Sequence, residues 1–231
     1  MESVDFLYEL AIRSDNLVLQ LLSHTPSWKY IAEFARLTVF WFDRLEYLVG
    51  MTLIYDEQVD WKSVYYDFQL LDVKSDVARA YNIYTVAFLA NWASVWVAIQ
   101  LGYVPNNNKL TIACGEGYTE TVALFLQEPH IDPASDDSRA LRAACNRERI
   151  DTVRLLLEDG RADPTIYNSY CLEVVSLRDN VELVRLLLED GRADPTIDRG
   201  SFIQQVREDE YFEILELLLA DRRVIAAGLA K

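Results

Sequence analysis

The sequence predicts an all-α fold in which short helix pairs stack into a solenoid. Fourteen residues occur twice, letter for letter, in the ranges Val153–Ile166 and Val184–Ile197, which are offset by 31 positions. The same offset relates four leucine-rich triplets, which begin at Leu124, Leu155, Leu186 and Leu217. A fixed period of this length indicates stacked units, each too small to bury a core alone.

Each unit is expected to hold two short helices. Apolar residues from Leu141 through Ala144 to Val153 follow the spacing of one buried helical face. The pattern breaks between the two helices at four equivalent places: Gly117-Tyr118, Glu148-Arg149, Asp179-Asn180 and Glu210-Tyr211.

The ends of these helices are also marked in the sequence. Gly160 and Gly191 stand where the second helix should stop, because glycine readily adopts the left-handed backbone of a helix C-terminus. Asp-Pro pairs then enforce an extended turn. Asn107, Ser138 and Ser169 precede the next helix and are expected to be its N-caps.

This arrangement resembles the ankyrin repeat, in which a turn or hairpin is followed by two antiparallel helices at about 33 residues. The matching features are the Leu-x-x-Ala start at Leu141, Gly117 between the helices, the Val-x-x-Leu-Leu second helix and the Gly-x-Ala-Asp tail. The family's Thr-Pro-Leu-His start is missing and the segment from Asp163 to Leu172 is short, so the hairpins are expected to be trimmed to turns. The compact repeat resembles arrays encoded by giant DNA viruses and some protists.

One departure concerns the turn between the helices. Glu148, Asp179 and Glu210 occupy the position of Gly117. If that position requires a positive φ, a glutamate there costs about 1 kcal/mol, and these turns are expected to be adjusted.

We divide the chain into a divergent, aromatic-rich helical cap at residues 1–79 and an ankyrin-type array at residues 80–231. Two or three degenerate repeats are the simplest reading of the cap, and an F-box in the first fifty residues is the alternative. Residues 51–63 break the pattern and are expected to form a loop or insertion. All five tryptophans precede residue 100: Trp28, Trp41, Trp61, Trp92 and Trp96.

The uncharged stretch at residues 80–108 raises the question of a membrane span. Asn82, Asn91 and Gln100 interrupt it, and its tryptophans lie mid-segment instead of at the interfaces. We therefore expect a buried helix pair there and no membrane span.

Composition bounds the function. A net charge of −15 would mostly repel phosphate, so no nucleic-acid partner is expected. Cys114 and Cys145 are one period apart and are expected to be unbridged core residues in a cytoplasmic or other reducing intracellular compartment, with a virus particle as the alternative. Neither a metal site, a cofactor nor an enzyme active site is expected, because no nucleophile elbow, phosphate-binding loop or zinc-ligand spacing occurs.

The resemblance implies that Arg142, Arg147 and Arg178 face the concave groove, next to the turn residues Tyr167, Asn168 and Ser169. Arginine and tyrosine are favoured contact residues, so this row is the candidate site for an acidic or polar partner protein. The alternative is a solvated helix face whose charges balance neighbouring acids. The acidic pairs Glu158-Asp159 and Glu189-Asp190 are expected to close exposed helices and to have no acid–base role.

Two functions follow as hypotheses. The first is a protein-binding scaffold that holds its partner on the concave face. The alternative is a structural subunit that packs into a virus particle or a homo-oligomer through its Trp-rich N-terminal region, so self-association stays open.

Overall fold

The computed structural model describes residues 59–64, 89–100 and 103–229, and every regular element in those ranges is a helix. The predicted all-α class is therefore confirmed. The chain divides into two compact units, residues 1–103 and residues 104–231. Trp28, Trp41 and the candidate F-box segment lie outside the described residues.

The described part of the first unit has a tryptophan core. Residues 61–64 are helical, so the end of the expected loop or insertion at residues 51–63 is not a loop. Trp61 is fully buried, and its ring lies 6.3 Å from the ring of Trp96 in α8 (Trp92–Gln100), measured between centroids. In the described ranges, no helix is long and apolar enough to cross a membrane.

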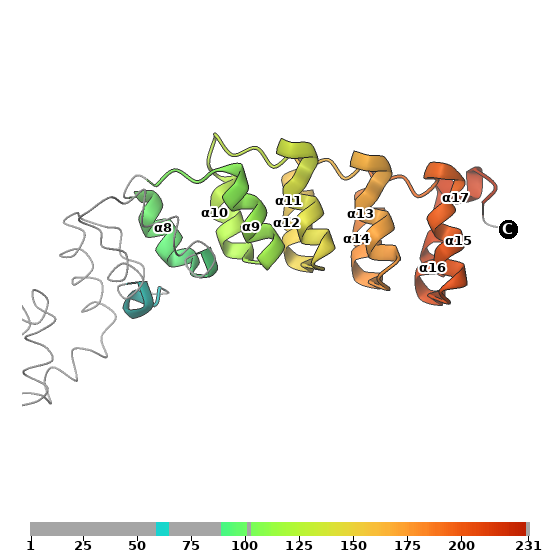
Figure 1. The fold of residues 1–231 in the computed structure, drawn as a ribbon, viewed down its shortest axis with the longest axis horizontal. Coiled ribbons are helices and arrows are strands. Elements are labelled where there is room, and N and C mark those ends of the chain that lie inside the picture. Colours follow the sequence, from blue (N-terminus) through green and yellow to red (C-terminus); the bar gives the residue numbers. More distant parts are fainter. Residues whose placement is uncertain (1–58, 65–88, 101–102, 230–231) are drawn as a thin grey trace, which may run out of the picture. The chain divides into compact units, whose positions relative to one another are not determined.

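The second unit consists of four consecutive helix pairs, as the repeat register predicts (Figure 1). The first helices of the pairs are α9 (Asn107–Glu116), α11 (Ser135–Asn146), α13 (Ile166–Ser176) and α15 (Ser201–Glu208). The second helices are α10 (Thr119–Leu126), α12 (Ile150–Asp159), α14 (Val181–Asp190) and α16 (Phe212–Ala220). A short 3-10 turn, η1 (Ile197–Arg199), precedes α15, and α17 (Arg222–Ala226) follows α16.

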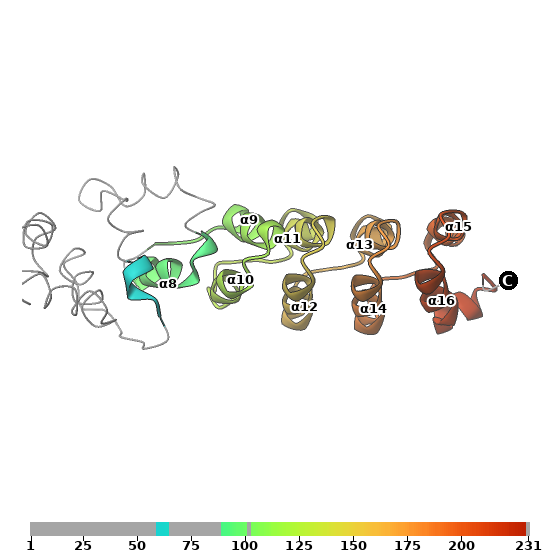
Figure 2. The same cartoon turned by 90° about the horizontal axis from the view of Figure 1, so that it is seen from below.

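The helices form two rows, with the first helices in one and the second helices in the other (Figure 2). Helix α11 packs against both α9 and α13, and α12 packs against both α10 and α14. Each pair therefore contacts the pairs on either side of it, as expected for a solenoid.

The core lies between the rows at the positions that the template predicts. Leu110, Leu141 and Leu172 have no exposed surface, and neither do Ala113, Ala144 and Val175 three residues later. In the leucine-rich triplets the middle residue is the fully buried one: Phe125, Leu156, Leu187 and Leu218.

The turn between the helices of each pair has one conformation throughout the array. Gly117 has φ +82°, and the equivalent residues Glu148, Asp179 and Glu210 have φ between +55° and +61°. The expectation that the non-glycine turns are adjusted was wrong. The stacked fold keeps the left-handed turn and accepts the strain in three of four repeats.

The expected N-caps have a different role. The N-cap of α9 is Asn106, whose side chain accepts a hydrogen bond from Lys109 N at 3.0 Å, and not Asn107. Ser138 and Ser169 have left-handed backbones and make no capping bond. The expectation was wrong because the side chains of Asn107, Ser138 and Ser169 are hydrogen-bonded to the tail that follows the same helix pair.

Candidate partner-binding face

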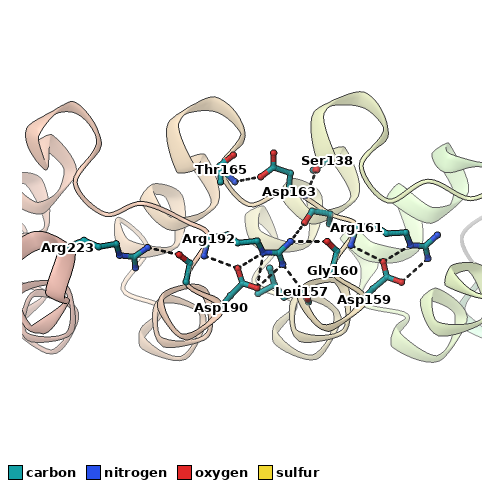
Figure 3. A network of polar contacts seen from close by, with 12 residues as sticks. Ser138, Leu157, Asp159, Gly160, Arg161, Asp163, Thr165, Asp190, Arg192 and Arg223 are labelled. Atoms are coloured by element: carbon teal, nitrogen blue, oxygen red, sulfur yellow. Dashed lines mark hydrogen bonds and ion pairs between the residues drawn. The ribbon is translucent and has the colours of Figure 1, made fainter.

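One edge of the array is held by an arginine that recurs in the tails after α12, α14 and α16 (Figure 3). Arg192 ion-pairs with Asp190 at 2.7 Å and also donates to the carbonyls of Gly160 at 3.0 Å and Ala162 at 2.8 Å in the preceding repeat. Its planar fork suits this bridging, because it presents several donors in fixed directions.

We call such an arginine, with its paired aspartate and its bonds to the preceding repeat, an arginine staple. The same staple occurs one period earlier and one period later. Arg161 pairs with Asp159 and donates to Ile131 O and Leu126 O, and Arg223 pairs with Asp221 and donates to Gly191 O and Ala193 O. Hydrogen bonds from the arginines lower the pKa of Asp159 and of Asp221. These aspartates orient the arginines that join the repeats.

A second set of bonds joins the turn before each helix pair to the tail that follows the same pair. Ser138 Oγ accepts from Asp163 N at 2.8 Å, Ser169 Oγ accepts from Asp194 N at 2.8 Å, and Asn107 Oδ1 accepts from Asp132 N at 2.9 Å. The three acceptors are one period apart, so the bond is a property of the stack. Ser169 is only 1% exposed and does not contribute to the surface that a partner could reach.

The turns before α11 and α13 have unusual backbones. Asp136, Asp137 and Ser138 all have φ between +51° and +57°, and residues 167–169 have φ between +50° and +60°. Three consecutive left-handed residues without glycine are strained, and such strain tends to gather at functional sites.

Arg142 and Tyr167 meet at these turns. The Arg142 guanidinium donates to Asp137 O at 2.9 Å and Asp136 O at 3.0 Å, and it lies 4.9 Å from the centre of the Tyr167 ring. The Tyr167 hydroxyl donates to the Asp137 carboxylate at 2.7 Å, and this bond raises the pKa of the tyrosine. Tyr167 is 59% exposed. Asn168, beside it, is exposed as well.

The predicted row of Arg147 and Arg178 lies at the other end of the first helices. Arg147 ion-pairs with Glu116 of the preceding repeat. Arg178 donates to Asn146 O and lies 4.0 Å from Glu148. Both side chains stay about half exposed. Of the predicted residues, the structure thus brings Arg142 and Tyr167 together and holds Arg147 and Arg178 apart from them in inter-repeat pairs.

The cysteines and histidines contribute little to this surface. Cys114, Cys145 and Cys171 are free and buried, as expected for the first two, and burial raises the pKa of the Cys114 thiol. A hydrogen bond with Cys171 raises the pKa of Cys145. His130 shares a 2.8 Å hydrogen bond with Pro105 O. Within the part of the chain that the structure describes, no group of three His, Cys, Asp or Glu side chains is placed to hold a metal ion.

Sequence reasoning missed the arginine staples and the role of Asp137. The staples had a visible signal, since Asp-x-Arg recurs in register at residues 159–161, 190–192 and 221–223. Asp137 had none, because its bond to Tyr167 joins residues thirty positions apart in a pair that occurs once.

The comparisons agree with this architecture. The family model for the ankyrin repeat matches residues 136–169, which run from the strained turn before α11 to the strained turn before α13. No curated protein and no solved structure matches the chain. The matched segment is similar to one ankyrin repeat, and it stands within four stacked helix pairs of one register.

Proposed function

We propose that this protein is a non-enzymatic scaffold that binds a partner protein through the face formed by the first helices and the turns before them. Ankyrin repeats generally mediate protein–protein interaction. The observation that carries the proposal is the exposed ring of Tyr167 on a strained turn, held against the half-buried Arg142. Both residue types are enriched where interfaces gain most of their binding energy.

The chain's own repeats support this choice of face. Val153–Ile166 and Val184–Ile197 are identical, and they cover the second helix and the tail, where stacking sets the residues. The turn that follows differs completely, with residues 167–169 reading Tyr-Asn-Ser and residues 198–200 reading Asp-Arg-Gly. Ser169 bonds to Asp194, but the exposed residues Tyr167 and Asn168 are available for recognition, because stacking does not set their identity.

A pulldown with matched variants tests the proposal. The full chain and the variants Tyr167→Ala and Arg142→Ala/Tyr167→Ala would be used as bait, beside Arg154→Ala/Arg185→Ala on the second helices. Partners identified by mass spectrometry should bind wild type and the second-helix control and lose at least tenfold in affinity with the turn variants. Equal capture by all variants, at equal melting temperatures, would move binding to another surface.

The assembly alternative depended on exposed tryptophans in the N-terminal region. Trp61 is instead buried and its ring packs near that of Trp96, so these residues serve the core of their unit. No specific observation on the described residues favours the alternative. Sedimentation of the purified chain checks it directly, because an assembly subunit should self-associate.

A further inference from the structure

The arginines on the candidate face are engaged within the molecule. Arg142 donates to two backbone carbonyls of the turn before α11. Arg147 and Arg178 are paired across repeats, and Arg149 donates to Gly115 O at 3.2 Å. Their positive charges are therefore oriented or balanced by groups of the chain itself. Arg139 is the exception, since it is exposed and has no polar partner within the described residues.

The carboxylates of this face are in the opposite situation. Asp136 in the turn before α11, Glu173 on α13 and Asp198 in η1 are all exposed. None of the three carboxylate groups has a hydrogen bond or an ion pair within the described residues. The Asp137 carboxylate accepts the neutral hydroxyl of Tyr167, and Arg142 donates to the backbone carbonyl of the same residue.

Tyr167 lies between these carboxylates along the array. It precedes α13, whereas Asp136 precedes α11 and Asp198 precedes α15, so the three stand on successive turns. Neighbouring helices pack about 8–10 Å apart, a step that an extended peptide covers in about three residues. The Tyr167 ring already holds one guanidinium, and aromatic rings attract such cations.

We propose that this face binds a basic segment of the partner, with lysine or arginine side chains directed at Asp136, Glu173 and Asp198 and an apolar or cationic group on Tyr167. The inference rests on the proposed function and specifies the partner's chemistry. It replaces the sequence-based expectation of an acidic or polar partner, because Arg142, Arg147 and Arg178, which suggested one, already bind groups of the chain itself. The chain's net charge of −15 favours the approach of such a segment.

Peptide binding to the full chain tests the charge assignment. The probes are two fluorescein-labelled synthetic peptides of equal length, one alternating arginine with glycine and the other alternating glutamate with glycine, measured by anisotropy at low and at physiological salt. The test variant is Asp136→Asn/Glu173→Gln/Asp198→Asn. The control is Glu158→Gln/Glu189→Gln/Glu216→Gln, which removes the same charge from the second helices.

The arginine peptide should bind wild type and the control, and the test variant should weaken binding roughly tenfold more than the control does, since exposed pairs contribute modestly and together. Tyr167→Ala should weaken binding, whereas Tyr167→Phe, which keeps the ring and frees the Asp137 carboxylate, should not. Equal losses in the two triple variants would mean attraction to net charge alone and would overturn the inference, as would preference for the glutamate peptide. A partner captured through Tyr167 by an acidic segment would overturn it too, and would leave the proposed scaffold function intact.

Discussion

At the scale of single residues, the turn between the paired helices shows where the fold outweighs local preference. Gly117 fits its left-handed backbone, but the same backbone at Glu148, Asp179 and Glu210 is strained for a residue with a side chain. Stacking determines this geometry, because the turn must return the chain to the second row of helices. A single substitution that relieves this backbone strain should therefore raise the free energy of unfolding.

Glu210→Gly should stabilise the protein. Glu210 has φ +61°, is exposed and has no side-chain partner within the described residues. The substitution removes the energetic penalty of the left-handed backbone, and it also increases the conformational entropy of the unfolded chain. Because the first effect is larger, the free energy of unfolding should rise by about 0.5–1 kcal/mol. Urea unfolding measures it. The control Glu216→Gly lies in right-handed helix α16 and should destabilise by about 1 kcal/mol. A loss at both positions would contradict the strain argument.

Two buried serines should respond in opposite ways to the same change. Ser176 is fully buried and its hydroxyl has no hydrogen-bond partner, whereas Cys114 and Cys145 occupy the equivalent positions. Ser176→Ala should therefore be neutral or stabilising by about 1 kcal/mol, because an unpaired buried hydroxyl is removed. Ser169→Ala should cost about 1–3 kcal/mol, because it orphans Asp194 N. Thermal melting of the two variants compares them, and like-signed shifts would refute the assignment.

At the scale of elements, the four helix pairs, their breaks and the stops at Gly160 and Gly191 could be predicted from the sequence, because periodicity and glycine report on local structure. The N-caps could not. A serine before a helix looks like a cap in sequence, and only the stacked fold shows that Ser138 bonds to a residue 25 positions away. The candidate site could be predicted only in part. The sequence placed Arg142 near Tyr167, and the two side chains are in contact. The ion pairs of Arg147 and Arg178 with the preceding repeat depend on packing and could not be predicted.

The arginine staples predict acid sensitivity. The lowered pKa of Asp159 and Asp221 means that folding favours their ionised forms. Their contribution is complete above the unfolded pKa of about 3.9 and is lost as pH falls through the lower folded pKa. Asp159→Asn/Asp221→Asn should lower the urea midpoint at neutral pH and flatten its fall below about pH 4. An unchanged acid profile in this variant would show that the staples do not stabilise the stack.

At the scale of the whole molecule, the repeats of the array are stabilised by contacts with the repeats next to them. The arginine staples and the buried helix faces join one repeat to the next, and the turn-to-tail bonds close each repeat. Stability then depends on the interfaces between repeats, and an inner repeat shares two of them. A disturbance in the second repeat should accordingly cost more than the same disturbance at the end of the array.

Ala144→Leu disturbs an inner interface, and Ala220→Leu is the surface control for the same chemical change. Ala144 is fully buried on α11, which packs against both α9 and α13, whereas Ala220 is exposed at the end of α16. Overpacking at Ala144 should destabilise by roughly 1–3 kcal/mol. The change at Ala220 should stay within about 0.5 kcal/mol, as for most surface substitutions. Urea unfolding followed by far-UV circular dichroism measures both. A small effect at Ala144 would show that the inner interface can relax, and would remove the basis for treating the repeats as tightly coupled neighbours.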